Sequence, residues 1–225
     1  MRKTLVSLLS FAAVIAFTGC SKNNDTPSNA ASVAFVNGCA GATGVDAKVN
    51  NAVVSGAANI ALWGNSGYKS VASGAGVDIA YFLTNVGTPV SSQSVSLTAG
   101  LHYTAFASGL LTAPSFLLVT DDLAAPASNK AKVRFVNLSP DAMSVTATAQ
   151  TTEFASGITS LRVSSFYAIT AGAYEIKAGD PSKIATIVTS GTQQLSAGKI
   201  YTVMLTGTLA GTGQSALKLT LLNNN

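Results

Sequence analysis

The chain has 225 residues, of which only 10% are charged, and its formal net charge is +4 at pH 7. Arg2 and Lys3 lie in a segment that we expect to be removed, so the mature chain carries +4 less 2, about +2. Nucleic-acid binding needs lysine and arginine clustered on one face, and this composition excludes it. Abundant Gly, Ala, Ser and Thr are instead typical of a β-rich protein outside the cytoplasm.

The first residues have the pattern of a secretory signal peptide. Arg2 and Lys3 precede an apolar run, Leu5 to Phe17, that is shorter than the roughly 20 residues needed to span a bilayer. The run leads into Phe17-Thr18-Gly19-Cys20, which resembles the lipobox of bacterial lipoproteins, with Phe17 in place of the usual Leu. This resemblance implies cleavage before Cys20 and lipidation of that residue with several acyl chains, such as palmitate. The alternative is that Cys20 merely ends an ordinary signal peptide.

We therefore expect residues 1–19 to be a signal peptide and residues 20–30 to be the lipidated cysteine and a flexible tether. Ser21 to Ala30 is polar, contains one proline and has nothing to bury. Ser21 after the cysteine resembles the pattern sorted to the outer membrane. The expected location is the outer membrane, lipid-anchored through acylated Cys20, facing the periplasm or the cell surface.

From Ala31 onward the sequence predicts strands. Val45 to Asn50 alternates apolar and polar residues without a miss, and no window has the spacing of a long amphipathic helix. Further strand-like runs lie at 59–62, 68–72, 77–83, 94–97, 102–107, 116–120, 132–137, 145–150, 164–169, 174–178, 184–189, 199–206 and 216–222.

An internal repeat divides this β-rich region. Ser32 to Ala42 and Lys132 to Ala142 share five positions in register: Val33/Val133, Phe35/Phe135, Val36/Val136, Asn37/Asn137 and Ala42/Ala142. Leu97 to Thr104 likewise matches Leu195 to Thr202, and Tyr68 to Gly74 matches Tyr167 to Gly172 more weakly. The second match places Tyr103 and Tyr201 just after a turn glycine, which predicts a tyrosine corner in each copy.

The repeat predicts two domains, residues 31–125 and 130–225, joined by a small-residue linker around Pro126. Each copy has about 95 residues and about seven short strands, which is the size of one immunoglobulin-like sandwich. We therefore expect an all-β protein with two tandem immunoglobulin-like β-sandwich domains.

The repeated motifs also resemble a known family. The opening stretch Ala131 to Ala142 and the elements Ala171 to Tyr174 (Ala-Gly-x-Tyr) and Ala197 to Tyr201 (Ala-Gly-x-x-Tyr) are similar to domain of unknown function 4397. That resemblance covers nearly all of residues 31–222 and implies all-β domains, single or in tandem, on bacterial envelope lipoproteins. Copy one departs from it at Cys39-Ala40-Gly41, where copy two has Ser-Pro-Asp. The family implies a fold and a location but no activity.

The sequence predicts no catalytic site, no metal site and no cofactor. The single histidine, His102, stands where copy two has Ile200, so it is expected to be an ordinary strand residue. No triad or G-x-S-x-G elbow can be assembled. Asp121 and Asp122 at the domain junction could ligate calcium, but a site needs six to eight ligands and no D-x-D-x-D loop is present, which favours a solvated linker.

Cys39 and a pair of aromatic residues are the remaining candidates. Cys39 is expected to be a small buried side chain without a disulfide, because Cys20 is lipidated. Trp63 and Tyr68 flank a loop-like stretch and are the candidate ligand-binding residues, since exposed Trp and Tyr serve in sugar stacking and protein recognition. The alternative is that Trp63 plugs the end of its own sandwich, and Phe166-Tyr167, its counterpart, is expected in the core.

These observations favour a non-enzymatic binding, adhesion or structural module of the cell envelope. Its expected partners are membrane lipid, through Cys20, and a protein or glycan of the envelope, with no nucleic acid. The alternative is a carbohydrate-binding surface lipoprotein of a glycan-capture system. A hydrolase is a third and weaker option.

Overall fold

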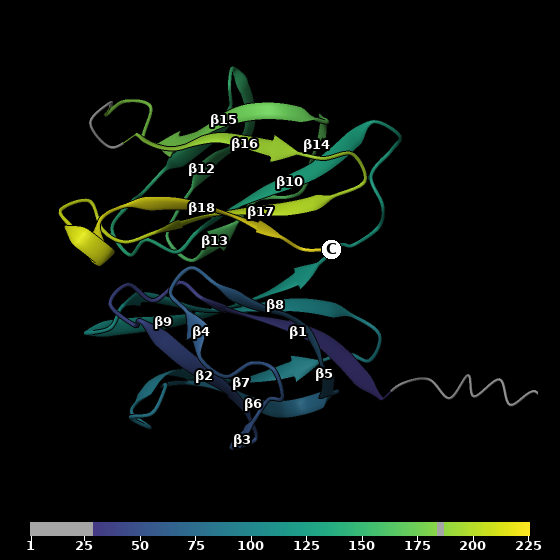
Figure 1. Cartoon of the computed structure of the whole chain (residues 1–225), viewed down its shortest axis with the longest axis vertical. Helices are drawn as coiled ribbons and strands as arrows, with labels where there is room; N and C mark the ends of the chain where they lie inside the picture. The colour runs from purple at the N-terminus through teal and green to yellow at the C-terminus, as the bar shows by residue number, and fades with distance from the viewer. Residues whose placement is uncertain (1–28, 184–186) are drawn as a thin grey trace, which may run out of the picture.

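In the computed structural model, which describes residues 29–183 and 187–225, almost the whole chain is β-strand (Figure 1). One 3₁₀ turn, η2 (Gly213–Ser215), is the only helical element of these two ranges. No helix in the described ranges is long and apolar enough to cross a membrane. The predicted signal peptide, Cys20 and most of the predicted tether lie outside the described residues.

The first domain packs two sheets. One has the order β5-β1-β8-β9, and the other has the order β3-β2-β6-β7, with β4 pairing β2. The strands are β1 (Ala30–Asn37), β2 (Gly44–Val49), β3 (Ala52–Val53), β4 (Ile60–Ala61), β5 (Asn65–Ala72), β6 (Gly74–Leu83), β7 (Pro89–Leu97), β8 (His102–Leu110) and β9 (Ala113–Asp121).

The second domain repeats this arrangement. One sheet has the order β13-β10-β17-β18, with β14 also pairing β10, and the other has the order β12-β11-β15-β16. The strands are β10 (Lys130–Asn137), β11 (Val145–Ala149), β12 (Thr152–Ile158), β13 (Arg162–Val163), β14 (Tyr167–Thr170), β15 (Gly172–Gly179), β16 (Val188–Leu195), β17 (Ile200–Thr206) and β18 (Lys218–Asn223).

The two domains share a parallel pairing of the first strand with the penultimate strand. Val33 lies opposite Tyr103 in the β1–β8 pair, and Val133 lies opposite Tyr201 in the β10–β17 pair. The other pairings between named strands are antiparallel. The predicted all-β class with two tandem sandwiches is therefore confirmed.

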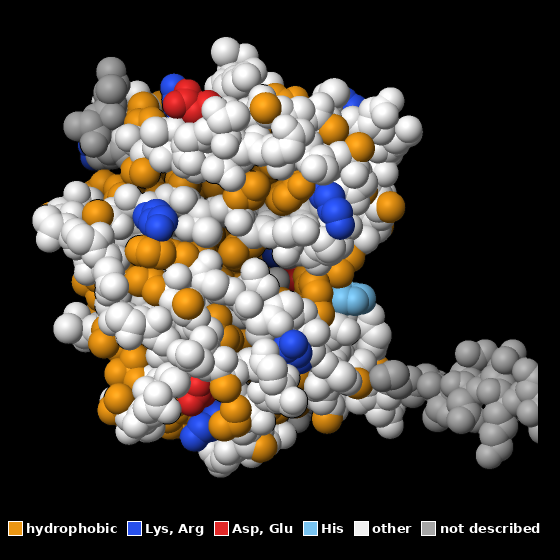
Figure 2. Space-filling view, viewed as in Figure 1, with side chains coloured by type: hydrophobic (Ala, Val, Ile, Leu, Met, Phe, Trp, Pro, Cys, Tyr) orange, Lys and Arg blue, Asp and Glu red, His pale blue; other side chains and the backbone are white. Residues whose placement is uncertain are grey.

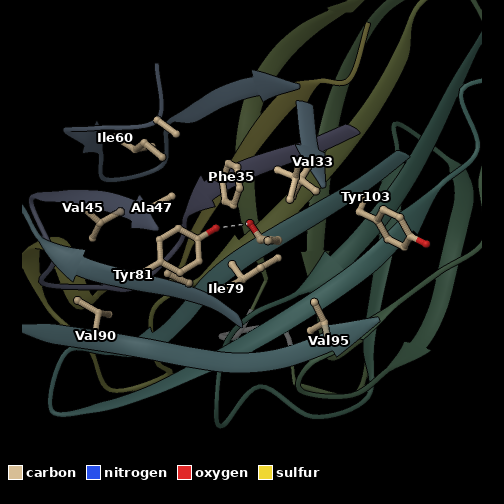
Figure 3. Close-up of a cluster of buried hydrophobic side chains, with 14 of the residues drawn as sticks. Val33, Phe35, Val45, Ala47, Ile60, Ile79, Tyr81, Val90, Val95 and Tyr103 are labelled. Atoms are coloured by element: carbon tan, nitrogen blue, oxygen red, sulfur yellow. Dashed lines mark hydrogen bonds between the residues drawn. The ribbon is translucent and has the colours of Figure 1, made fainter. Parts of the chain in front are cut away.

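Each sandwich encloses its own apolar core, and Figure 3 shows the core of the first domain. There the Tyr81 hydroxyl donates to the Ala105 carbonyl at 2.6 Å and satisfies its polar end. The tyrosine corners are also present. The Thr98 N–H donates to the Tyr103 hydroxyl at 3.0 Å, and the Ser196 N–H donates to the Tyr201 hydroxyl at 3.1 Å.

The repeated asparagine at the end of the first strand holds the turn that follows it. The Asn37 amide donates to the carbonyls of Ala42 and Ile60 at 2.9 and 3.1 Å. Asn137 donates in the same way to Ala142 and Ile158 at 2.6 and 3.2 Å. Both asparagines are fully buried, so their polar groups need these partners. This explains why the asparagine and the alanine recur together in the repeat.

Strand β12 was not predicted from the sequence. Its residues Phe154 and Ala155 are adjacent and both buried, so the segment lacks the alternation that marks a strand. The cause is irregular pairing with β11, whose register shifts twice along this segment. Gly157, with φ of 66°, adds a residue type that usually signals a turn.

We expect Asn137→Ala to lower the free energy of unfolding by about 2–4 kcal/mol, because it leaves the buried Ala142 carbonyl and the partly buried Ile158 carbonyl without their donor. Urea unfolding followed by circular dichroism measures the change. The matched control is Asn223→Ala at an exposed position, which should shift stability by about 0.5 kcal/mol or less. Equal effects of the two substitutions would contradict the role of the buried amide.

Candidate functional site at the domain interface

Four strands are buried on both faces, which a single sandwich does not explain. Every residue of β17 is buried, as are seven consecutive residues of β8 and the last five residues of β1 and β10. In β1, Val33 and Phe35 belong to the core of the first domain, whereas Val36 belongs to a separate cluster. Near-continuous apolar strands are typical of sheets that are covered on both sides.

The second face of these strands packs against the other domain. A third apolar cluster joins the two sandwiches, which lie stacked on one another in Figure 1. It contains Val36, Phe106, Val119, Val136, Leu138, Met204 and Leu222, with Trp63, Leu117, Leu161 and Val163 packed against it. The molecule is therefore four sheets deep, and the two middle sheets meet across this cluster.

Equivalent positions of the two copies meet in the cluster. Val36 lies opposite Phe106 in its sheet, just as Val136 lies opposite Met204. An ideal Cβ on Gly38 would lie 2.8 Å from the Leu138 side chain, so position 38 touches its own equivalent, 138, across the interface. Contacts between equivalent positions are the mark of an isologous, two-fold type of interface. A side chain at position 38 would force the Leu138 side chain to shift and would lie 3.1 Å from the Ala107 carbonyl, which favours glycine there.

A buried polar network crosses the same interface. The Arg134 guanidinium forms an ion pair with Asp121, and both side chains are almost fully buried. The Arg134 Nε also donates to the Thr202 hydroxyl at 3.0 Å, and another guanidinium N–H donates to the Thr120 carbonyl at 3.3 Å. The first domain supplies Thr120 and Asp121, and the second supplies Arg134 and Thr202, so the network ties the two together.

The second oxygen of Asp121 is satisfied within the first domain. It accepts hydrogen bonds from the hydroxyls of Tyr68 and Thr104, each at 2.6 Å. Burial raises the pKa of Tyr68 well above its usual range, and the negative charge of Asp121 adds to the effect. Tyr68 therefore stays protonated and keeps donating to the carboxylate.

Asp121 thus corrects the prediction of a solvated linker. It is the last residue of β9 and is 7% exposed, whereas Asp122 is exposed and pairs with Lys132 at 2.8 Å. Only Asp122 fits the predicted environment. Over residues 29–183 and 187–225, no group of three His, Cys, Asp or Glu residues is placed to hold a metal ion.

Trp63 lies at the interface and not on an exposed loop or at the end of its own core. Its indole N–H donates to the Thr206 hydroxyl of the second domain at 3.1 Å. The Lys218 ammonium lies 3.3 Å from the ring centroid, also from the second domain. The structure thus gives Trp63 contacts that join the domains, and Tyr68 is held by Asp121.

The equivalent contact on the other side of the interface is incomplete. Leu161 is the counterpart of Trp63. The Leu161 backbone N–H donates to the Asn137 carbonyl just as the Trp63 backbone N–H donates to the Asn37 carbonyl, and both residues have positive φ. The leucine side chain has no hydrogen-bond donor to match the Trp63 indole. The Ser108 hydroxyl, which corresponds to that of Thr206, is buried without a partner among the described residues. The interface is therefore symmetric in shape but not in its polar bonds.

The remaining candidate residues have structural environments. His102 lies in β8, as predicted, and its ring meets Tyr68 edge to face at 5.3 Å. Cys39 is buried and forms no disulfide, and burial raises the pKa of its thiol to about 11. The expectation that Tyr167 lies in the core is wrong, because its side chain is 41% exposed.

Sequence reasoning missed the residues that make the network. Arg134 stands between the buried residues Val133 and Phe135. Because side chains alternate along a strand, its side chain lies on the opposite face of the sheet, and only this placement could have drawn attention to it. Copy one has Ala34 at the same position, which is a signal that the two copies differ in side-chain chemistry there. Asn224 was also missed, although it accepts from the Thr202 hydroxyl at 2.8 Å.

A family model described as "Domain of unknown function (DUF4397)" matches residues 31–148 and 138–225. A search of curated proteins finds no match. A candidate cell adhesion protein from Bacteroides uniformis ATCC 8492 is 10% identical with a TM-score of 0.25, and the match covers 88% of this chain and 100% of that chain. A second, from Bacteroides ovatus ATCC 8483, is 12% identical with a TM-score of 0.24, over 86% and 95%. TM-scores this low carry no argument about function.

We expect Arg134→Met to lower the free energy of unfolding by about 3–5 kcal/mol, because it leaves the Asp121 carboxylate buried without its counter-charge. Urea unfolding followed by the fluorescence of the single tryptophan, Trp63, measures this at the interface itself. The control is Lys132→Met, which breaks the ion pair between half-buried Lys132 and exposed Asp122 and should cost about 1 kcal/mol or less. A similar cost for both variants would contradict the assignment.

Proposed function

The chain belongs to the family of domain of unknown function DUF4397, and we propose that it is a lipid-anchored envelope lipoprotein acting as a binding, adhesion or structural module without enzymatic activity. The anchor is Cys20, and the location is the outer membrane, facing the periplasm or the cell surface. The lipobox-like stretch at residues 17–20 supports the anchor, and the family resemblance supports the envelope.

The observation that carries the proposal is the shared core between the domains. A third apolar cluster and a buried ion pair hold the two sandwiches together, so loops from both domains keep fixed positions relative to one another. Such an arrangement suits a module that presents a composite surface to a partner, because few degrees of freedom are lost on binding. Loops on a rigid β scaffold are the usual place for recognition residues.

The glycan-capture alternative depends on Trp63 and Tyr68 as stacking residues. Both side chains are already engaged, Trp63 with Thr206 and Lys218, and Tyr68 with Asp121. No observation in the described structure therefore favours glycan capture over the proposed module.

We expect Trp63→Ala to lower the free energy of unfolding by about 2–4 kcal/mol, because it empties part of the domain interface. Thermal and urea unfolding measure this, with the exposed Val86→Ala as the control. If Trp63 were instead a free stacking residue, Trp63→Ala would abolish glycan retention and leave stability unchanged. That result would revive the alternative.

Cys20→Ser should release the protein from membranes, because it removes the thiol that carries the diacylglycerol. Membrane fractionation with and without detergent, combined with mass spectrometry of the N-terminal peptide, measures this. The control is Cys39→Ser, which changes the buried cysteine and should leave the protein membrane-bound. Detergent-dependent fractionation of the Cys20→Ser protein would refute the anchor.

The binding role is tested with a fragment of residues 21–225, which contains every strand of both domains. The immobilised fragment is exposed to solubilised envelope proteins and to envelope glycans, and retained molecules are identified. The same fragment carrying Arg134→Met tests whether retention depends on the fixed domain arrangement. Retention of nothing above a denatured control would leave only a passive structural role.

A further inference from the structure

The two-fold character of the interface creates two equivalent sites, and only one of them is filled. In the second domain, the side chain at position 134 is an arginine that crosses to the first domain. In the first domain, the equivalent residue is Ala34, and beside it lies a pocket with a volume of about 230 Å³. Figure 2 shows hydrophobic side chains along the boundary between the two domains.

The strand registers establish which residues correspond. Val119 and Leu222 lie opposite Thr104 and Thr202, and Asp121 and Asn224 each lie two positions further along the chain. The hydroxyls confirm this, because Thr104 donates to Asp121 at 2.6 Å and Thr202 donates to Asn224 at 2.8 Å. Asn224 is thus the counterpart of Asp121.

The same registers identify the aromatic neighbours. Tyr68 lies opposite Ala34, and Tyr167 lies opposite Val133, so the residue before it, Phe166, is the counterpart of Tyr68. This corrects the weak sequence match of Tyr68 with Tyr167 by one residue. The Arg134 guanidinium lies over the Phe166 ring, 4.7 Å from its centroid.

Each contact of Arg134 therefore has a counterpart around the Ala34 pocket. Arg134 meets an aromatic ring, a threonine hydroxyl, a strand carbonyl and a side-chain oxygen. The Ala34 pocket is lined by the corresponding residues, namely Tyr68, Thr104, Asn223 and Asn224.

The side chains that line the pocket are uncharged and offer hydroxyl and amide oxygens as acceptors. The Asp121 carboxylate lies 2.6 Å behind the Tyr68 hydroxyl, but it is already paired with Arg134, whose Nε reaches Thr202 on the pocket wall at 3.0 Å. Lys199 also contacts the Asn225 carbonyl at 3.2 Å, so the pocket offers a guanidinium acceptors but no free counter-charge. Asn224 is 8% exposed, and its amide nitrogen has only a long contact, 3.5 Å, to the Tyr68 hydroxyl. Because Asn224 replaces the carboxylate found on the filled side, a cation here binds more weakly than Arg134 does.

We propose that the Ala34 pocket binds a guanidinium group, the end of an arginine side chain presented by a protein partner. The partner's arginine takes the place that Arg134 occupies on the other side, stacking near Tyr68 and donating to Thr104, Asn223 and Asn224. The identity of the partner rests on the proposed binding role, but the pocket itself does not. A test with a free guanidinium compound therefore separates the two.

The test is an NMR titration of the 21–225 fragment with arginine amide. We expect shifts of the backbone signals of Ala34, Tyr68, Thr104 and Asn224 that saturate with a dissociation constant of about 1–10 mM, as suits a single side chain. Lysine amide has the same charge without the planar fork, and it should bind at least about fivefold more weakly.

Two variants supply the control. Ala34→Arg provides the guanidinium from the chain itself and should abolish the response, and Ala34→Met fills the pocket without charge and should do the same. If Ala34→Arg fails to fold, Ala34→Met still decides the question. The proposal is overturned by no response at about 50 mM arginine amide, by an equal response to lysine amide, or by an unchanged response in the folded variant. Any of these results leaves the envelope-binding role intact.

Discussion

Burial of the two middle sheets on both faces is the constraint on which the rest of this structure depends. Strands β8 and β17 carry apolar side chains toward their own sandwich and toward the other domain. Without its neighbour, each domain would expose a continuous apolar face of a kind that monomeric proteins rarely show. The two copies are therefore parts of one folding unit, although each has its own core and its own tyrosine corner.

Duplication within one chain has allowed the two halves of the interface to diverge. A homodimer must place the same residue on both sides of its two-fold axis. Here one side has Arg134 with Asp121, and the other has Ala34 with Asn224. The same divergence separates Trp63, which finds a hydroxyl acceptor, from Leu161, which leaves the Ser108 hydroxyl unpaired within the described ranges. The asymmetric positions are where the two copies make different contacts across the interface.

The sequence predicted the fold well and the interface poorly, for a physical reason. Alternation and turn glycines report which residues face a core, and the repeat of Asn37 and Asn137 marked where each domain begins. The alternation does not say what covers the second face of a strand, so Trp63 was expected either to bind a ligand or to plug its own sandwich, and Asp121 was expected in a solvated linker. Both depend on contacts between residues more than 10 positions apart, such as Trp63 with Thr206, that no local pattern encodes.

The parallel pairing of β1 with β8 has a mechanical consequence. Strand β1 begins at Ala30 and lies in the middle of its sheet, between β5 and β8. A pull along the strand axis, applied to the chain before this strand, loads the backbone hydrogen bonds to both neighbours together, in shear. Because β8 also packs against the second domain through Phe106, such a load reaches the second domain through the two middle sheets.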